Sequence, residues 1–273
     1  MTTGSTSVRR SLGRRLKQLR EQAGKSYAEV VESTIASRAK LARIEAGQQQ
    51  VKVADVRALC WLYGVDQNLT DQLANLSLQT ARKGWWEAHG DAVPTWFTTY
   101  IERESAALEA LTYQSDLIPG LLQTPDYHRS IFEAARLQPP DSAERQVQLR
   151  VDRQHAAFDR LAPLTLSAVL SEGVLAREIG GTKIMAEQRK HLLELSRRTN
   201  IFVRVLPFTV GAHPAMKGAF TVLGFNSPDD PDLVYLETSA GGRYIEESAR
   251  LLQYREDFTR VRDQSVPIEE YLK

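Results

Sequence analysis

Three basic side chains stand close together in the stretch "SRAKLARIEAGQQQ", residues 37–50. Leu41 and Ile44 are three positions apart, so they share one face of a helix. The basic residues lie off that face: Arg38, Lys40 and Arg43. Such charges are often only a solvated surface. They also suit a polyanion, because lysine and arginine bind phosphate and the arginine fork matches the edge of guanine.

Periodic apolar residues around this stretch predict a small all-α domain. Five short helices are expected, at residues 8–22, at 27–33, from the N-cap Ser37 to Gly47, at 53–63 and at 67–80. Ser26 and Glu29 have the spacing of a capping box at the start of the second helix. The second and third helices are joined by the short turn "STIAS". Two helices joined in this way are typical of a helix-turn-helix unit.

Three segments then resemble the Cro/repressor (XRE) family of DNA-binding domains across residues 8–78: "LGRRLKQLREQAGKSYAEV", "SRAKLARIEAG" and "VADVRALCWLYGV". The resemblance is carried best by one spaced set, namely Ser37, Leu41, Arg43, Ile44, Glu45 and Gly47. It implies that the third helix enters the major groove of a double-stranded DNA operator. Arg38, Ala39 and Arg43 would then face the bases, with Ser37 at the start of the reading helix.

Other residues of this domain are expected to hold it on the DNA or to orient it. Lys40 is a point charge on a flexible stem and suits a phosphate. Ser26 and Tyr27 begin the second helix, whose free N–H groups favour the phosphate backbone. Arg20 is expected to pair with Glu45. That pair would orient the reading helix without touching DNA.

Two positions depart from the pattern of the family. Ile35 stands in the turn where that family often has glycine, so we expect a turn of different shape with Ile35 directed inward. The loop after Gly47 reads "QQQV" and carries no basic residue. Glutamine donates hydrogen bonds to phosphate but adds no charge, which predicts weak non-specific affinity.

Charge is distributed unevenly along the chain. Residues 1–83 hold 14 lysines and arginines against 7 aspartates and glutamates, a balance of +7. Residues 84–273 hold 21 against 27, a balance of −6. This asymmetry predicts that the first part meets a polyanion. Nucleic acid is favoured over a membrane, because the basic part has no strongly apolar face to insert.

Length and composition narrow the class of protein. The chain has 273 residues, enough for two domains, and 42% are hydrophobic. It has no apolar run long enough to span a bilayer, and "MTTGSTSVRR" lacks the apolar stretch of a secretory signal. The single cysteine, Cys60, is expected to pack in a helix. We expect a cytoplasmic protein that is nucleoid-associated when bound to DNA.

The predicted domains are a helix-turn-helix domain at 1–80, a tryptophan-rich linker at 81–96 and a larger domain at 97–273. Glu87 and Asp91 argue against base stacking by the linker tryptophans. The larger domain mixes helices with apolar runs rich in β-formers, so the fold class is α+β with a sheet of about four or five strands. Helices are expected at 94–111, after Pro125, at 142–161, at 185–199 and at 244–263, and extended segments at 112–117, 164–170, 201–208, 218–225 and 233–238.

Four further segments resemble the large C-terminal domain of actinomycete XRE-type regulators: "KGWWE", "IPGLLQTPDY", "LPFTVGAHPAMKGAFTVLGF" and "VYLETSAGGRYIEE". The resemblance covers almost all of residues 84–273. That family is described as toxin–antitoxin-like, and its genes are commonly neighboured by one for a small partner protein. The resemblance implies a partner of this kind and no particular reaction.

Residues that could carry chemistry are sparse in this second part. Glu172 follows a strand, His213 lies in a loop with glycine and proline, and Tyr235 and Glu237 share one face of a strand. These four form a candidate ligand pocket at strand ends. A lone histidine in such a loop is more often a hydrogen-bonding residue. The sequence lacks a phosphate loop, a nucleophile elbow and metal-ligand spacing. We therefore expect no catalytic residues, no metal and no cofactor.

Three hypotheses follow for the whole chain. The first is a homodimeric transcription regulator whose second domain dimerises and binds a partner protein. The second keeps the DNA-binding domain and gives the second domain a small-molecule ligand. The third is an enzyme tethered to a DNA-binding domain. A closed, dry cavity lined by Glu172, His213 and Tyr235 favours the second hypothesis, an exposed apolar surface favours the first, and turnover of a substrate favours the third.

Overall fold

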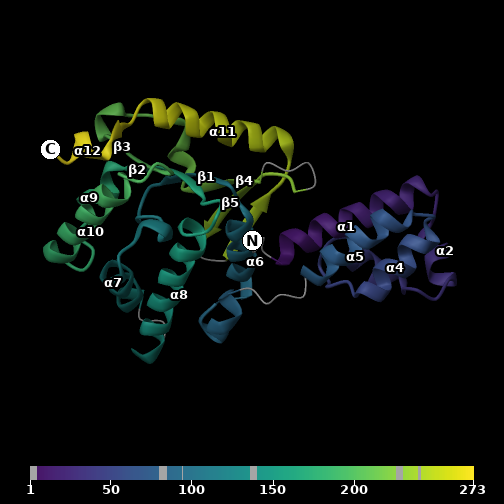
Figure 1. Ribbon diagram of the computed structural model, residues 1–273. Coiled ribbons are helices and arrows are strands. Elements are labelled where there is room, and N and C mark those ends of the chain that lie inside the picture. The colour runs from purple at the N-terminus through teal and green to yellow at the C-terminus, as the bar shows by residue number, and fades with distance from the viewer. Residues whose placement is uncertain (1–4, 80–84, 94, 136–139, 226–229, 239–240) are drawn as a thin grey trace. The chain divides into compact units, whose positions relative to one another are not determined.

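The computed structural model describes residues 5–79, 85–93, 95–135, 140–225, 230–238 and 241–273 (Figure 1). The chain divides into two compact units. The first unit consists of residues 1–87 and 227–231, and the second consists of residues 88–226 and 232–273 and contains a sheet. The α+β fold class expected from the sequence is confirmed. The expected linker at 81–96 lies in part outside the described residues.

Five helices build the first unit, as expected: α1 (Ser5–Gln22), α2 (Tyr27–Glu32), α3 (Arg38–Glu45), α4 (Val53–Leu62) and α5 (Gln67–Gln79). The apolar positions that predicted these helices face one core, which includes Leu12, Leu16, Leu41, Ile44, Val56, Cys60 and Leu73. The capping box at Ser26 and Glu29 is present, and Ser37 caps α3. The side chain of Val8, expected on the same face of α1, lies outside the described residues.

Helix α1 passes unusually close to the end of α3 at a buried glycine. A Cβ atom at Gly13 would lie 2.2 Å from the carbonyl oxygen of Ile44 and 3.0 Å from that of Glu45. Real Cβ atoms essentially never approach so near to a backbone oxygen. Glycine at position 13 therefore sets the spacing between α1 and the end of α3.

The turn between α2 and α3 contains a residue in the left-handed region, and the different turn shape expected from the absence of glycine stays a prediction. Thr34 adopts a φ of +62°, in the left-handed region that a β-branched residue rarely enters. Ile35 follows it and packs against the core of the first unit. A residue held in this region costs on the order of 1 kcal/mol, and here the cost is offset by the burial of Ile35.

The sheet of the second unit has seven strands among the described residues, more than the four or five expected. They are β1 (Glu109–Gln114), β2 (Thr165–Ser171), β3 (Ile201–Leu206), β4 (Phe220–Gly224), β5 (Leu233–Thr238), β6 (Gly241–Ile245) and β7 (Val266–Pro267), in the order β6-β5-β4-β1-β2-β3-β7. The central strands β1, β2 and β3 are parallel, and each remaining neighbour is antiparallel.

Two boundaries differ from the sequence expectation because pairing in the sheet overrides local helix preference. The helix expected at 94–111 is α6 (Thr95–Ala106), and the chain then enters β1. The Leu108 N–H donates to the carbonyl of Gly224 at 2.8 Å, so the ladder begins there. The last helix, expected from residue 244, is α11 (Ser248–Asp263), because residues 241–245 form β6 beside β5.

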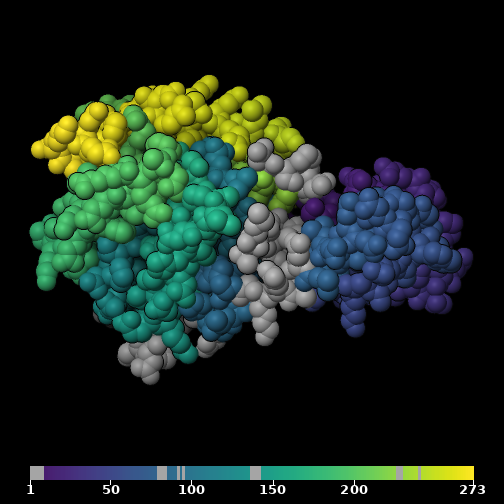
Figure 2. Space-filling model, viewed as in Figure 1, coloured from purple at the N-terminus to yellow at the C-terminus, as the bar shows by residue number. Residues whose placement is uncertain are grey.

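Helices cover both faces of this sheet (Figure 1). On one face, α11 packs Phe258 and Val261 against Tyr113 and Val222, and Figure 2 shows it as a yellow-green layer along one side of the unit. The other face carries the larger core and most of the remaining helices: α6, α7 (Pro125–Ala135), α8 (Pro140–Phe158), α9 (Glu172–Ala176), α10 (Thr182–Leu195) and α12 (Ile268–Tyr271).

The close approach at Gly13 predicts that replacing this glycine by alanine lowers the stability of the first unit, the opposite of the usual effect in a helix. In an open helix, Gly→Ala stabilises by about 1 kcal/mol, because alanine is the better helix former. Gly13→Ala should instead destabilise the first unit by about 1–3 kcal/mol, because the new methyl group collides with the backbone of α3. Urea unfolding followed by circular dichroism measures this. Gln18→Ala, at an exposed position of the same helix, is the matched control; a Gly13→Ala protein as stable as that control contradicts the steric constraint.

Candidate nucleic-acid interface and candidate ligand cavity

Helix α3 presents the three residues expected to face bases, two in its first turn and Arg43 in its last turn. Arg38, Ala39 and Arg43 are exposed, whereas Leu41 and Ile44 are buried in the core behind them. The Ser37 hydroxyl accepts from the Lys40 N–H at 3.2 Å, which fixes the first turn of the helix. Within the described residues, neither the Arg38 nor the Arg43 guanidinium has a hydrogen-bond or ion-pair partner. Both are therefore available to an external ligand.

Lys40, Ser26 and Tyr27 make contacts inside the protein. The Lys40 ammonium group lies 2.9 Å from Asp55 Oδ1 and is partly exposed, so a phosphate there would compete with a carboxylate. The Ser26 side chain is engaged with Glu29 in the capping box. The Tyr27 hydroxyl donates to Glu45 Oε2 at 2.7 Å. The N–H groups of Ser26 and Glu29 are also taken up, by the capping box at the start of α2, so the phosphate contact expected from Ser26 and Tyr27 stays a prediction.

A buried ion pair connects α1 to the end of α3. Arg20 Nε donates to Glu45 Oε1 at 2.6 Å and Arg20 Nη2 donates to Glu45 Oε2 at 3.1 Å, so the pair expected between these residues is present. The hydrogen bond that Arg20 donates to Glu45 raises the pKa of Arg20. Burial, followed by the hydrogen bond to Glu45, raises the pKa of Tyr27, so its hydroxyl stays protonated and donates. The effect of this network on DNA binding stays a prediction.

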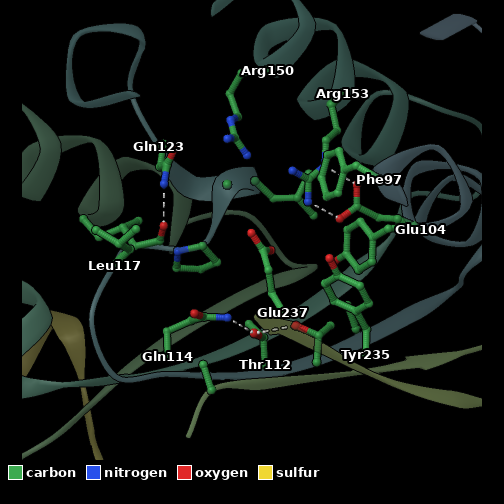
Figure 3. Close-up of a pocket in the computed structure, with 18 of the residues that line it drawn as sticks. Phe97, Glu104, Thr112, Gln114, Leu117, Gln123, Arg150, Arg153, Tyr235 and Glu237 are labelled. Atoms are coloured by element: carbon green, nitrogen blue, oxygen red, sulfur yellow. Dashed lines mark hydrogen bonds and ion pairs between the residues drawn. The ribbon is translucent and has the colours of Figure 1, made fainter. Parts of the chain in front are cut away.

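The second unit contains a cavity of about 450 Å³ between α6, α7, α8 and the sheet (Figure 3). A cavity of this size lies within the range of about 300–1,000 Å³ that small-molecule sites occupy. Its floor comes from β1, β4 and β5, where Gln114 donates to Thr112 at 2.9 Å. Its opposite wall comes from α8 and the short 3₁₀ helix Gly120–Leu122.

One end of the cavity is closed by a buried ion pair and by aromatic rings. Arg153 Nε and Nη2 donate to the two carboxylate oxygens of Glu104, at 2.5 and 2.6 Å. The Phe97 and Tyr100 rings are stacked at 5.3 Å, and Tyr100 contacts Tyr235 at 4.2 Å between ring centroids. We call Phe97, Tyr100 and Tyr235 the aromatic wall.

A second guanidinium, that of Arg150, projects into the cavity without a carboxylate partner among the described residues (Figure 3). Its Nη2 lies 3.3 Å from His128 Nδ1. Burial, and then the charge of Arg153, lower the pKa of Arg150 to about 9, so it remains cationic at neutral pH. Burial, and then the charges of Arg150 and Arg153, lower the pKa of His128 to about 3. His128 is therefore neutral, and its Nδ1 accepts from Arg150.

The path of the backbone leaves room for this guanidinium at one glycine. A Cβ atom at Gly120 would lie 1.7 Å from Arg150 Nη1 and 2.8 Å from Arg153 Nη1. Any other side chain at position 120 would displace Arg150. The cavity is therefore shaped around the arginine.

Three buried polar atoms at the cavity have no hydrogen-bond partner among the described residues: the Tyr235 hydroxyl, Gln123 Oε1 and His128 Nε2. The side chain of Gln123 uses its amide nitrogen to donate to the Ile118 carbonyl at 2.6 Å. Burying a polar group without a partner costs about 1–3 kcal/mol. Several such groups in one cavity are typical of a site that receives a polar ligand.

The structure brings together only two of the four residues expected to line a ligand pocket. Tyr235 and Glu237 line the cavity, whereas Glu172 and His213 are not in its lining. Glu172 accepts from the Phe208 N–H at 2.6 Å. His213 contacts Tyr113, which belongs to the core beneath α11 on the other face of the sheet. Successive residues of a strand face opposite sides, so residues near strand ends need not share a site.

Sequence reasoning missed the side chains that give the cavity its chemistry, namely Glu104, Gln123, His128, Arg150 and Arg153. One signal was available. Arg150 and Arg153 are three positions apart in a long helix and follow Val147 on the buried face of α8. Two arginines on the apolar face of a helix indicate a buried ion pair or a site. Their partners come from other helices, 49 residues away for Glu104, and could not be read from the local pattern.

Comparison with known proteins now gives both units a family. Residues 11–73 match the model of a helix-turn-helix domain. Residues 97–272 match the family described as a domain of unknown function, DUF5753. This match spans more than half of the sequence, so the chain belongs to the DUF5753 family and carries a helix-turn-helix domain before that region. No curated protein and no solved structure matches the chain.

The helix-turn-helix domain supports a DNA-binding regulator, which is the coarse form of the function expected from the sequence. Among the helices described, none is both long and apolar enough to cross a membrane.

The buried, neutral His128 predicts a dependence of stability on pH. Its pKa is about 3 in the folded protein against 6.5 for an ordinary histidine, so below pH 6.5 the unfolded chain binds a proton that the folded protein does not. Stability therefore falls as pH falls through this window, with a contribution of up to about 1.4 kcal/mol per pH unit. His128→Gln should remove that contribution. Urea unfolding of both proteins at about pH 7 and about pH 5 measures it, and equal pH slopes would contradict the burial of an uncharged imidazole.

Proposed function

We propose that this protein is a sequence-specific, DNA-binding transcription regulator that reads the major groove of an operator with α3. The observation that carries the proposal is the exposed pair of guanidinium groups, Arg38 and Arg43, which have no partner in the described part of the chain and lie on a helix whose other face is fixed in the core. Arginine at such a position donates two hydrogen bonds to guanine O6 and N7. Ala39 between them leaves room for a base edge.

The surroundings of α3 support the same function. The balance of +7 over residues 1–83 suits a polyanionic partner. The Arg20–Glu45 pair, together with the Tyr27 hydroxyl, holds the end of α3 against α1 and α2. We propose that this network orients the reading helix from behind. The partly exposed Lys40 would give up its contact with Asp55 and bind a phosphate of the DNA backbone instead.

We further propose that the chain acts as a homodimer. A single helix-turn-helix unit reads one half-site, and two-fold dimers on near-palindromic operators are the common arrangement. Residues 84–273 would hold the dimer together. The small partner protein and the antitoxin-like role that the family resemblance implies stay predictions. The cavity in the second unit favours the alternative in which that unit binds a small molecule.

Substitution of the two arginines tests DNA reading. Arg38→Ala or Arg43→Ala should each cost about 1–3 kcal/mol at the operator and relax base preference at one position. Operators can be selected from random DNA with the wild-type protein, and affinities measured by fluorescence anisotropy on selected and scrambled duplexes. Lys40→Ala should weaken binding to both duplexes alike, because a phosphate contact carries no sequence information.

Lys17→Ala provides the control, because it removes one exposed positive charge from α1. It should leave the ratio of affinities for the two duplexes unchanged. If the double variant lacking Arg38 and Arg43 retains the wild-type ratio, α3 is not the reading helix.

The dimer is tested by light scattering. The full chain should give twice the mass of one chain, and the fragment of residues 84–273 should do the same. A monomeric fragment beside a dimeric full chain would move the interface to the helix-turn-helix unit. A monomeric full chain at micromolar concentration would remove the dimer from the proposal.

A further inference from the structure

The cavity of the second unit holds a cation that the protein does not neutralise directly. Arg153 is paired with Glu104 through two hydrogen bonds, whereas the Arg150 guanidinium has no carboxylate within ion-pair distance among the described residues and donates to the neutral His128. The charges of Glu104 and Glu237 act on it only from a longer distance. A partly buried guanidinium without a carboxylate is costly, and its lowered pKa expresses that cost. An anion placed against Arg150 would relieve it.

The opposite wall of the cavity holds a negatively charged hydrogen-bond acceptor, the carboxylate of Glu237. Figure 3 shows the Glu237 carboxylate pointing into the cavity from β5, opposite Arg150. Within the described residues no ion pair joins Glu237 to Arg150 or to any other cation. The unpartnered Tyr235 hydroxyl lies two residues earlier on the same face of the strand. A cationic donor would find acceptors here.

The aromatic wall gives one end of the cavity a preformed apolar surface. The aromatic wall is packed ring against ring, and the Arg153 guanidinium lies 5.2 Å from the centroids of both Phe97 and Tyr100. The rings are therefore held by the buried ion pair as well as by each other. A flat apolar surface of this kind binds a hydrocarbon or aromatic group at little conformational cost.

The charges at the cavity favour a ligand with groups of both signs. The lining holds two guanidinium groups, Arg150 and Arg153, and three carboxylates, Glu104 and the exposed Glu237 and Asp116. Glu104 is paired with Arg153, and Asp116 accepts from the Ser115 hydroxyl. A simple anion would bring Arg150 a partner but face Glu237 with a like charge. A molecule with both an anionic and a cationic group satisfies each wall and leaves the balance unchanged.

We propose that this cavity binds a small zwitterionic molecule of the amino-acid class, with its carboxylate on Arg150, its ammonium group on Glu237 and an apolar side chain against the aromatic wall. His128 positions Arg150, because its neutral Nδ1 accepts from the guanidinium. Gly120 keeps the space in which that guanidinium lies.

Binding of the ligand would also regulate DNA binding, and this part of the inference rests on the proposed DNA-binding function. Phe97, Tyr100 and Glu104 all lie on α6, which is the first long helix after the helix-turn-helix unit in the chain. Operator affinity changes if the ligand binds the DNA-free and the DNA-bound states of the chain with different affinities.

Calorimetric titration of the full chain with three probes tests the ligand class. L-Phenylalanine has both charged groups, 3-phenylpropionate has only the carboxylate and phenethylamine has only the ammonium group. We expect saturable binding of L-phenylalanine, binding of 3-phenylpropionate that is weaker by about tenfold or more, and no binding of phenethylamine. Absence of saturable binding by all three at millimolar concentration overturns the proposal.

Two substitutions assign the charged groups. Arg150→Met should weaken L-phenylalanine by about 10- to 100-fold, and Arg145→Met, at an exposed position of the same helix, should leave binding unchanged. Glu237→Gln should reduce the preference for L-phenylalanine over 3-phenylpropionate, while the exposed Glu247→Gln should retain it. Unchanged affinity in Arg150→Met overturns the site.

Thermal unfolding separates a lost ligand contact from a lost fold. Arg150→Met removes an unneutralised charge from the cavity, so its unfolding midpoint should equal or exceed that of the wild type. The double variant lacking Arg38 and Arg43 should bind L-phenylalanine with wild-type affinity even though it no longer reads DNA. If the proposed DNA-binding function is wrong, the calorimetric titration should therefore still show binding of L-phenylalanine. Bound L-phenylalanine with unchanged operator affinity overturns the regulatory step alone.

Discussion

The bidentate contact between Glu104 and Arg153 is the interaction around which the second unit is arranged. Both side chains are buried, and the pair joins α6 to α8 across one end of the cavity. Removing one partner of such a pair costs about 3–5 kcal/mol, because the other charge is left without compensation. The Arg153 guanidinium also contacts the rings of the aromatic wall, and its positive charge lies near Arg150. Without the pair the apolar core could still pack, but one end of the cavity would be open and the charge of Arg153 would no longer be offset by Glu104.

The first unit uses a similar device for another purpose. Arg20 and Glu45 are buried between α1 and the end of α3, and Tyr27 adds a third hydrogen bond from α2. The contact lies behind the exposed arginines and takes no part in their chemistry. Together with the close approach at Gly13, it fixes the position and the rotation of α3. In both units a buried carboxylate thus holds a helix so that another side chain of the structure remains available.

Local signals explain why the first unit could be predicted almost residue by residue. The capping serines at 26 and 37, the glycine stops and the 3.6-residue period are all properties of short segments, and the structure retains them. In the second unit, "ESAALEAL" has strong helix formers, yet its last three residues open β1 because two neighbouring strands supply hydrogen bonds. Strand β6 begins with two glycines and β7 has two residues, so neither has a local strand pattern.

Only two of the four residues predicted to line a pocket line the cavity, because the sequence reveals local relations and the cavity is built from distant segments. Tyr235 and Glu237 share a strand face, and this local relation was enough to group them. Their true neighbours come from α6, α7 and α8, and no spacing rule connects those helices to β5. Glu172 and His213 resembled them in type and in their place near strand ends. The fold places His213 beside the core on the other face of the sheet, and it places Glu172 at the start of α9, where its carboxylate accepts from the Phe208 N–H.

The order of the strands has a consequence for how the protein is made. Thr112 on β1 meets Thr221 on β4, 109 positions later in the chain, and β5 follows β4. At about 5–20 residues per second, a ribosome needs roughly 5–20 s to supply the strands that complete the cavity floor once β1 has been synthesised. Every core residue of the helix-turn-helix unit precedes β1. Each new molecule therefore passes through an interval in which its DNA-binding part has all its core residues and its cavity does not yet exist.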